Sequence, residues 1–535
     1  MKKLLLGDEA IALGAIDAGL SGVYAYPGTP STEITEFIQL YEAKNASTNP
    51  IFCRWAANEK TAMEAALGMS YMGKRALVCM KHVGMNVCAD AFMNSAVTGV
   101  NGGLVVLAAD DPSMHSSQNE QDSRFYAKFA MIPCFEPSNQ QEAYDMIGRA
   151  FTLSEELHTP ILMRVTTRMA HSRAVVETAA ETRPQNTAKP VDNPRHFILL
   201  PVNARNNYNE LVDKQTLFSK ASETMGYNTY VKGTNPKKAI LTTGIGYNYL
   251  MEHYTGAESV LKVVQYPLPT AMIAQMIKDG AEEILVIEEG QPVVEELLKS
   301  VLYEMGAKVR VVGRLTGALP RVGELCPDVV RLALGQQALP TKPAEDIIVA
   351  RPPALCQGCG HRDMYAALNE VAKEYADTRV FGDIGCYTLG ALPPFQALHS
   401  TLEMGASVTM AKGAADAGQH PAIAVIGDST FTHSGITGLL DCVNSHANVV
   451  IIISDNLTTG MTGGQDSAGT GRLEQICRGV GVEDAHVRVV IPLPKNMEEM
   501  KQVLREEIAY DGPSVVIARR ECLQTLKRHL KAAKK

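Results

Sequence analysis

Val425-Ile426-Gly427-Asp428-Ser429 and Ile452-Ile453-Ser454-Asp455-Asn456-Leu457-Thr458 are the two stretches that decide the fold of this chain. Each stretch is an apolar run, rich in Val and Ile, that ends in small acidic or amide residues. Adjacent buried strands of a parallel sheet have this composition when they deliver ligands at their carboxyl ends. The sequence therefore predicts an α/β fold with a site just after these two strands.

A Gly-Asp-Ser turn followed by an Asn on the next strand resembles the pattern with which thiamine diphosphate enzymes hold Mg²⁺ on the diphosphate. Mg²⁺ prefers hard oxygen ligands in octahedral geometry. Asp428 would supply a carboxylate, Asn456 an amide oxygen and Thr458 its main-chain carbonyl, while Gly427 would let the backbone approach the diphosphate. The alternative is an ordinary strand–turn pair in a Rossmann-like sheet, and the position of Asn456 favours the cofactor.

Length and composition restrict the class of protein. A chain of 535 residues is too long for one core, and we expect roughly three or four domains. The net charge of −8 and the isoelectric point near 6.0 argue against a nucleic-acid partner. No run approaches the ~18 apolar residues of a membrane span. Eleven cysteines without a leader predict reduced thiols or metal ligands and a cytoplasmic location.

Alternation of helix and strand patterns predicts two large α/β domains that flank a smaller one. We expect a pyrimidine-binding thiamine domain at 1–180, a linker at 181–235 and a smaller domain like the transketolase C-terminal domain at 236–336. A second linker is predicted at 337–353, before a diphosphate-binding thiamine domain at 354–535. Two parallel-sheet domains suit thiamine enzymes because the cofactor lies between separate domains.

Within the first predicted domain, Ser31 is expected to cap a helix that runs to Tyr41. Glu59 follows a predicted strand and precedes a helix of small residues. Thiamine chemistry needs a carboxylate that hydrogen-bonds the pyrimidine ring, and Glu59 is our candidate, with Glu64 as the decoy. The alternative is that Glu59 stands in a first helical turn only because the helix dipole favours an acid there.

Four cysteines form the second candidate site. Cys356 and Cys359 make a Cys-x-x-Cys bracketed by glycines, Cys386 follows a predicted strand, and Cys522 follows the last strand. From the spacing alone, the pair could bind zinc, bind an iron–sulfur cluster, carry out redox chemistry or do nothing.

Several longer motifs carry a specific resemblance. They are Tyr26-Pro27-Gly28-Thr29-Pro30-Ser31, Asn58-Glu59-Lys60, Lys81-His82-Val83-Gly84-Met85-Asn86, Asp110-Asp111-Pro112, Ser116-Ser117-Gln118-Asn119-Glu120-Gln121-Asp122, Cys356-Gln357-Gly358-Cys359-Gly360-His361-Arg362, Gly382-Asp383-Ile384-Gly385-Cys386-Tyr387-Thr388-Leu389-Gly390 and Met461-Thr462-Gly463-Gly464-Gln465. From end to end, the chain resembles the large subunits of the indolepyruvate:ferredoxin oxidoreductases, within the 2-oxoacid:ferredoxin oxidoreductase superfamily.

The resemblance implies that Cys356, Cys359, Cys386 and Cys522 ligate a [4Fe–4S] cluster beside the thiamine, with Cys522 matched by position more than by local motif. It also places Gly385, Tyr387 and Ser429 at the cofactor. The remaining cysteines are expected to be buried small hydrophobes: Cys53, Cys79, Cys88, Cys134, Cys326, Cys442 and Cys477.

The activity implied is oxidative decarboxylation of a 2-oxoacid, such as indolepyruvate, with coenzyme A, and electrons leaving through the cluster to ferredoxin or a ferredoxin-like carrier. Thr29, Lys81, His82 and His433 are the candidate contacts to substrate or cofactor, although each could be structural. A polar loop is a weaker candidate, through His115, Gln118, Gln121 and Arg124. The expected partner is a small (beta) subunit, in a dimer of heterodimers.

One departure from the family pattern stands out. The family's large subunits usually continue into a ferredoxin-like domain with Cys-x-x-Cys-x-x-Cys repeats, and no such repeat occurs before Lys535. We expect either a shortened chain or an electron-relay domain on another chain. Two rival functions remain: a non-redox thiamine decarboxylase or carboligase whose cysteines bind zinc or are vestigial, and a non-catalytic scaffold subunit.

Overall fold

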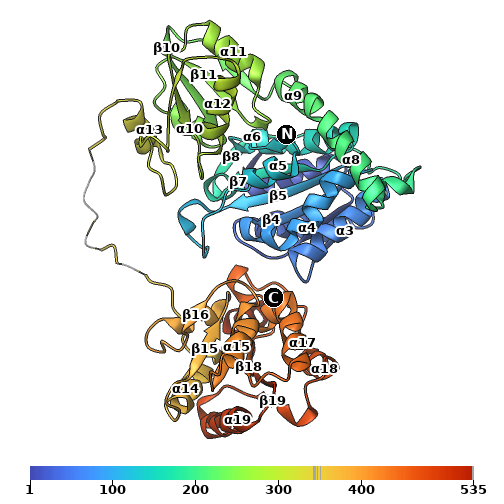
Figure 1. The fold of residues 1–535 in the computed structure, drawn as a ribbon, viewed down its shortest axis with the longest axis vertical. Coiled ribbons are helices and arrows are strands. Elements are labelled where there is room, and N and C mark those ends of the chain that lie inside the picture. The colour runs from blue at the N-terminus through green and yellow to red at the C-terminus, as the bar shows by residue number, and fades with distance from the viewer. Residues whose placement is uncertain (341–344, 346, 350, 533–535) are drawn as a thin grey trace. The chain divides into compact units, whose positions relative to one another are not determined.

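The structure is a computed structural model that describes residues 1–340, 345, 347–349 and 351–532 (Figure 1). The chain divides into two compact units, Met1–Lys342 and Pro343–Lys535, which are described separately below. Of the predicted linker 337–353, positions 341–344, 346 and 350 lie outside the described residues. In the part of the chain that is described, we find no helix with the length and apolarity needed to cross a bilayer.

The first sheet of unit 1 has seven strands in the order β12-β6-β7-β5-β4-β2-β3, all parallel except β12. Their bounds are β2 (Gly22–Ala25), β3 (Phe52–Trp55), β4 (Ala76–Lys81), β5 (Leu104–Asp110), β6 (Cys134–Phe135), β7 (Ile161–Thr166) and β12 (Gln265–Tyr266). A separate antiparallel pair joins β1 (Lys2–Leu6) to β8 (Arg173–Glu177). The predicted α/β architecture is confirmed.

Helices cover both faces of this sheet. They are α1 (Gly7–Asp17), α2 (Thr32–Asn45), α3 (Glu59–Tyr71), α4 (His82–Thr98), α5 (Arg124–Ala130), α6 (Gln140–Leu157) and α7 (Thr167–His171). Alternate residues of β4 enter opposite cores, because side chains of a strand point alternately to its two faces. Leu77 and Cys79 pack with α1, α2 and α6, whereas Val78 and Met80 pack with α3 and α4.

The second sheet of unit 1 is smaller, with the strand order β14-β13-β10-β11-β9 and only β9 antiparallel. Its strands are β9 (Thr229–Val231), β10 (Asn235–Thr243), β11 (Glu258–Val263), β13 (Glu283–Ile287) and β14 (Arg310–Val312). Its helices are α10 (Gly246–Met251), α11 (Thr270–Lys278), α12 (Val293–Glu304) and α13 (Pro327–Ala333).

Two local expectations differ from the structure. The segment 181–235, predicted as a linker, contains α8 (Pro201–Asp213), α9 (Gln215–Thr224) and the edge strand β9. Leu211 and Phe218 anchor these helices in the core, although most of their residues are polar. The hydroxyl of Ser31 does not cap α2 but donates to the carbonyl oxygen of Gly28 at 2.7 Å, so it closes the preceding turn.

A buried network of charged side chains joins the two sheets of unit 1. The guanidinium of Arg124 pairs with Glu288 at 2.9 Å, and that of Arg164 pairs with Asp110 at 2.6 Å. Both guanidinium groups also donate to the main-chain oxygen of Glu289, at 3.1 and 3.0 Å. Because Glu288 and Glu289 follow β13, the network fixes the smaller sheet against the larger one.

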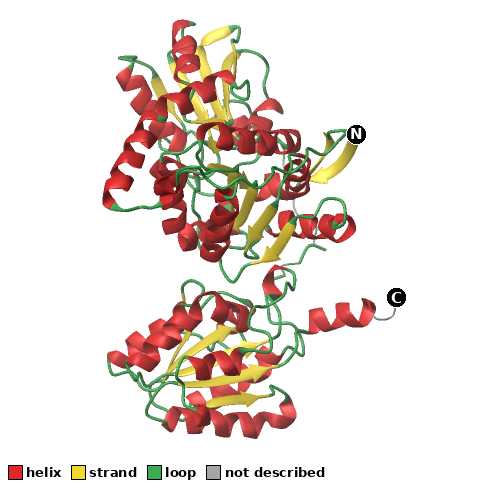
Figure 2. Ribbon diagram, turned by 90° about the vertical axis from the view of Figure 1, so that its right-hand side faces the viewer, coloured by secondary structure: helices red, strands yellow, loops and turns green. Residues whose placement is uncertain are grey.

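Unit 2 contains a six-stranded, fully parallel sheet in the order β16-β15-β17-β18-β20-β19, with helices on both faces (Figure 2). The strands are β15 (Arg379–Gly382), β16 (Ser400–Thr401), β17 (Ala422–Gly427), β18 (Val450–Asp455), β19 (Val487–Val490) and β20 (Ser514–Arg519). The helices are α14 (Gly360–Ala372), α15 (Ala406–Asp416), α16 (Asp428–Thr430), α17 (Ile436–Asn444), α18 (Leu473–Gly479), α19 (Met497–Ala509) and α20 (Leu523–Ala532). The expectation that β17 and β18 are adjacent, buried and parallel is confirmed.

Candidate active site

Four parallel strands of unit 2 end at one edge of the sheet, and each is followed by a predicted site residue. Cys386 follows β15, Asp428 follows β17, Asn456 follows β18 and Cys522 follows β20. Carboxyl ends of neighbouring parallel strands share one edge of the sheet, so distant segments meet there.

Asp428 has the properties of a cation ligand. Its side chain is buried, and its Oδ2 atom has no hydrogen-bond partner among the described residues. Burial, followed by repulsion from Asp455, raises the pKa of the Asp428 carboxyl to about 7. A buried carboxylate oxygen without a donor is costly unless a cation or a proton meets it. The site therefore fits the Mg²⁺–diphosphate grip that the sequence predicts.

The loop after β18 carries the other two predicted oxygen ligands, Asn456 and Thr458. The side chain of Asn456 accepts a hydrogen bond from the backbone N–H of Thr458 at 3.2 Å, and Leu457 between them has a φ of +61°. A branched residue rarely adopts this left-handed conformation, which is typical of tight functional turns. The hydroxyl of Thr459 donates to Ser429 Oγ at 3.0 Å, so this loop is bonded to the turn after β17.

The position of the Tyr387 ring explains why two residues at this edge, Gly385 and Gly427, are glycine. A Cβ atom on Gly427 would lie 2.6 Å from Tyr387 Cε1, and one on Gly385 would overlap the same ring. The Tyr387 hydroxyl donates to Asp383, whose carboxylate also accepts from the Ser407 hydroxyl at 2.7 Å. The buried ring thus fixes the ends of β15 and β17 against each other, a role for Gly427 that the sequence did not reveal.

The four predicted cluster cysteines converge at the same edge. Burial raises the pKa of the Cys386 thiol to about 12, with further contributions from Cys522, Cys359 and Cys356, in that order. The backbone N–H of Cys522 donates to the carbonyl oxygen of Asn456 at 3.0 Å, which places the cysteine set beside the candidate Mg²⁺ ligand.

His361 and His433 are buried near this edge. His361 Nε2 lies 3.5 Å from the amide nitrogen of Asn456, and burial lowers the pKa of its imidazole to about 4, so the ring is neutral at physiological pH. His433 lies in a π-helical turn, Phe431–Gly435, with Nδ1 2.6 Å from Ser434 Oγ. Such π-turns are frequent at functional sites.

In unit 1, the predicted residues also stand at a carboxyl edge, after β2, β3 and β4. Glu59 begins α3 and is buried, with Asn58 as the N-cap. A Cβ atom on Gly84 of α4 would lie 2.7 Å from Glu59 Cγ and 2.8 Å from its Oε1. Gly84 therefore makes the space for the Glu59 carboxylate, a role that the sequence analysis missed.

Lys81 and His82 are buried next to one another at the end of β4. The Lys81 ammonium donates to the carbonyl oxygen of Ser116 at 2.5 Å, and burial lowers its pKa to about 8. His82 Nε2 lies 3.2 Å from the carbonyl oxygen of Asn119, and its Nδ1 has no hydrogen-bond partner in the described part of the chain. A Cβ atom on Gly28 would lie 3.0 Å from Lys81 Cβ, so the loop that holds Thr29 packs on Lys81.

The four residues predicted to line a polar loop of unit 1 differ in their exposure to solvent. His115 and Gln118 are exposed, and His115 Nε2 lies 3.4 Å from Glu324. Gln121 is half-buried. The prediction is wrong for Arg124. This side chain is not exposed on a loop but is buried in the charge network with Asp122 and Glu288. Among the cysteines expected to be buried, Cys326 is only partly so.

Two family models match this chain. Residues 13–231 match the family model "Pyruvate flavodoxin/ferredoxin oxidoreductase, thiamine diP-bdg", and residues 383–518 match "Thiamine pyrophosphate enzyme, C-terminal TPP binding domain". Indolepyruvate oxidoreductase subunit IorA of Methanothermobacter marburgensis is 39% identical, over 97% of this chain and 86% of the relative. The IorA subunit of Archaeoglobus fulgidus is also 39% identical, with the same coverage.

The chain belongs to the IorA family of indolepyruvate oxidoreductase subunits. This confirms the resemblance to the 2-oxoacid:ferredoxin oxidoreductases, and the chain is an enzyme subunit of that class with thiamine diphosphate-binding domains. A solved 2-oxoglutarate:ferredoxin oxidoreductase from Magnetococcus marinus is 14% identical, with a TM-score of 0.48 over 62% of this chain and 65% of that one.

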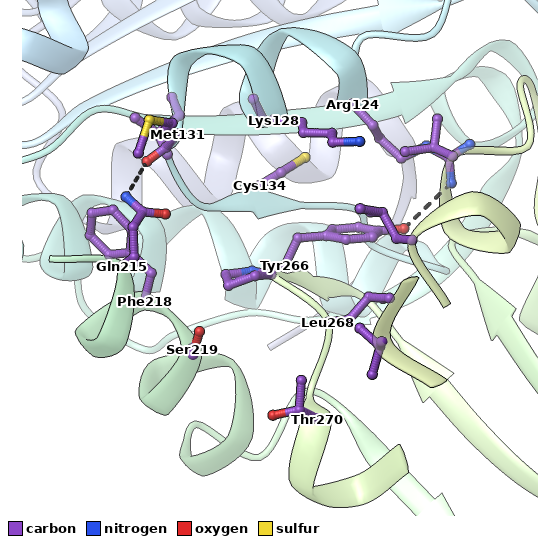
Figure 3. Close-up of a pocket in the computed structure, with 16 residues that line it drawn as sticks. Arg124, Lys128, Met131, Cys134, Gln215, Phe218, Ser219, Tyr266, Leu268 and Thr270 are labelled. Atoms are coloured by element: carbon purple, nitrogen blue, oxygen red, sulfur yellow. Dashed lines mark hydrogen bonds between the residues drawn. The ribbon is translucent and has the colours of Figure 1, made fainter. Parts of the chain in front are cut away.

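A cavity of about 270 Å³ lies between the two sheets of unit 1 (Figure 3). Its walls come mainly from α5, α9 and α12, and Tyr266 crosses its centre. Gln215 donates to the carbonyl oxygen of Met131 at 2.9 Å at one end. Thr29, Glu59, Lys81 and His82 are not among its lining residues, so this cavity is separate from the predicted substrate contacts.

Gly84→Ala tests the packing of Glu59. Alanine normally stabilises a helix by about 0.5–1 kcal/mol relative to glycine, but here the methyl group meets the Glu59 carboxylate. We expect a net loss of about 1–3 kcal/mol from overpacking and a fall in kcat of up to about a hundredfold from displacing Glu59. Urea unfolding and steady-state kinetics measure the two effects.

Gly68→Ala is the matched control, because a Cβ atom at Gly68 of α3 meets nothing within 4 Å. This variant should be as active as the parent and slightly more stable. Equal behaviour of the two variants would contradict the proposed contact.

Asp428→Asn should change the pH dependence of stability. The folded-state pKa of Asp428 lies near 7, above the usual value of 3.8, so the folded state binds more protons between these limits. The free energy of unfolding without cofactor therefore falls as pH rises from about 4 to 7. We expect the variant to be more stable than the parent by about 2–4 kcal/mol at pH 8, with a smaller difference at pH 5.

Urea titrations at the two pH values measure this difference. The variant should also lose the rise in melting temperature that Mg²⁺ and thiamine diphosphate give the parent. A stability difference that does not vary with pH would contradict the assignment.

Proposed function

We propose that this chain catalyses the oxidative decarboxylation of an aryl pyruvate, such as indolepyruvate. One 2-oxoacid and one coenzyme A would give acyl-CoA, CO₂, a proton and two electrons, and the electrons would pass through a [4Fe–4S] cluster to ferredoxin. Membership of the IorA family supports the substrate class, and the two thiamine diphosphate-binding domains support the cofactor.

The observation that carries the redox part is the position of the cysteines. The four cysteines come from three segments, with Cys356 and Cys359 in one and Cys386 and Cys522 in two others, and they converge at one edge of the sheet beside Asn456. Iron–sulfur clusters are commonly held by four such thiolates.

In this proposal, Asp428, Asn456 and the carbonyl of Thr458 hold Mg²⁺ on the cofactor diphosphate. The unpartnered Asp428 oxygen and the Asn456–Thr458 turn are the features that support this. Thiamine diphosphate, when bound, supplies the electron sink for decarboxylation. Ser429, Gly385, Tyr387 and His433 would shape the cofactor pocket.

Unit 1 would supply the acid–base and substrate groups. Glu59 is buried, and its carboxylate fits into the space that Gly84 leaves by having no side chain. This packing suits a carboxylate that forms a hydrogen bond with the pyrimidine ring of the cofactor. Lys81, with its pKa of about 8, is poised to become fully charged when the carboxylate of a 2-oxoacid lies beside it. His82 offers its unpartnered Nδ1, and Thr29 its hydroxyl.

The subunit would act with a small subunit, in a dimer of heterodimers, and with a ferredoxin-like carrier. Anaerobic turnover of several 2-oxoacids with coenzyme A and a viologen dye, with and without that subunit, tests the proposal. We expect aryl pyruvates to be preferred and dye reduction to require coenzyme A. A colourless, iron-free protein that still decarboxylates would support the non-redox alternative, and the absence of any cofactor-induced melting shift would support a scaffold.

A further inference from the structure

A second group of ligand-type side chains lies in unit 1, outside the predicted thiamine site. Asp8 stands in the first turn of α1, Glu33 in the first turn of α2, and His171 is the last residue of α7. One carboxylate oxygen of each acid and one ring nitrogen of the histidine all lie within 4.8 Å of one another. Three separate helices therefore bring two carboxylates and an imidazole to one point.

The carboxylate of Asp8 is the feature that points to a ligand. Asp8 is fully buried, and neither of its oxygens has a hydrogen-bond partner among the described residues. The Oε2 atom of Glu33 is likewise buried and without such a bond, and it lies 3.5 Å from His171 Nε2. Two acids that approach this closely in a buried site repel each other unless a cation or a proton lies between them.

We propose that Asp8, Glu33 and His171 bind a divalent transition-metal ion of the zinc type. Zinc accepts imidazole nitrogen and carboxylate oxygen at about 2.0–2.2 Å, and three side chains at the observed mutual distances can converge on one such ion. Glu33 and His171 are each about one-third exposed (37% and 33%), so water can complete the coordination.

Neighbouring thiols are not part of this group. Cys79 lies close enough to Asp8 for the two to interact electrostatically, but among the described residues no cysteine sulfur belongs to the set of ligand atoms within 4.8 Å of one another. The ligand atoms brought together are oxygen and nitrogen only, in contrast to the cysteine set of unit 2.

The position of the site indicates what the ion would do. Glu33 lies in the first turn of α2, three residues after Pro30, and Asp8 and His171 belong to two other helices, α1 and α7. A metal ion would fasten the three helices and hold the loop of Thr29 and Pro30 in place. The inference does not depend on the proposed oxidoreductase activity, because its test measures bound metal rather than turnover.

The test compares four forms of the full-length chain: the parent, Asp8→Asn, His171→Gln and the control Glu36→Gln, one turn further along α2. Each is stripped with a chelator, saturated with Mg²⁺ and thiamine diphosphate, loaded with Zn²⁺ under anaerobic conditions, dialysed and analysed for metal. We expect the parent and Glu36→Gln to retain one more equivalent of zinc than the other two. Zinc bound by cysteines would be equal in all four.

Co²⁺ loading provides the second measurement. The difference spectrum between the parent and His171→Gln should show ligand-field bands without thiolate charge-transfer bands. His171→Gln keeps the test valid if Asp8→Asn folds poorly, because His171 is partly exposed. Equal zinc content in the parent and His171→Gln would overturn the proposal. So would a melting temperature that depends on pH but not on metal, since Asp8 and Glu33 would then share a proton.

Discussion

Glu59→Gln should lower kcat by about 10²–10⁴-fold, the range for loss of a positioned acid–base group. Glutamine has nearly the same shape as glutamate, but it is neutral and cannot form the charged hydrogen bond that a carboxylate makes with the pyrimidine ring. The contact with Gly84 should be kept, because it involves the aliphatic part of the side chain as well as the carboxylate. Cofactor affinity, measured as the melting shift caused by Mg²⁺ and thiamine diphosphate, should therefore change little.

Glu64→Gln is the matched control. Glu64 lies on the same helix, about half-exposed (48%), and forms an ion pair with Lys60 on the surface. Exposed pairs contribute roughly 0–1 kcal/mol, so this variant should retain parental kcat and nearly parental stability. Full activity of Glu59→Gln would remove Glu59 from the mechanism.

Cys386→Ser should abolish dye reduction and remove nearly all protein-bound iron. The Cys386 thiol interacts electrostatically with the thiols of Cys356, Cys359 and Cys522. Its replacement would leave the cluster with three of its four thiolates. Iron analysis and the visible absorbance of anaerobically purified protein measure the cluster. Release of CO₂ from the 2-oxoacid without dye should persist, because decarboxylation precedes electron transfer.

Cys442→Ser is the control for chemical change at a thiol. Cys442 is buried in α17, and burial raises its pKa to about 12, as for Cys386, but its neighbours are not cysteines. We expect a stability cost with full iron content. If both variants kept their iron, Cys386 would not be a ligand of the cluster.

Strand ends were the part of the fold most readable from the sequence. Asp428 and Asn456 follow apolar runs that can only be buried strands, and the parallel pairing of β17 and β18 agrees with this prediction. Glu59 was placed at a strand-to-helix junction, and it begins α3. In each case, a local pattern and a simple rule about sheets were sufficient.

Contacts between distant segments were not readable. Gly84 looks like any small residue in a helix, and its role depends on Glu59, which belongs to another helix. Arg124 stands in a polar run that resembles a surface loop, yet its partner Glu288 is far along the chain. The sequence of α8 and α9 predicts a linker because few apolar residues, chiefly Leu211 and Phe218, anchor these helices.

The buried charge network of unit 1 extends beyond the end of the first family match, so the end of that match is not the end of a folded unit. The first family match ends at residue 231, but Glu288 and the main-chain oxygen of Glu289, which compensate Arg124 and Arg164, lie beyond that point. A fragment cut at the family boundary would keep both guanidinium groups beside Asp110 and Asp122 but would lose the bond of Arg124 to Glu288 and both bonds to Glu289. Each lost hydrogen bond to a charged group costs about 1.5–3 kcal/mol. The segment that matches the family model is therefore stabilised from outside its own boundary, and a truncation should retain the smaller sheet as well.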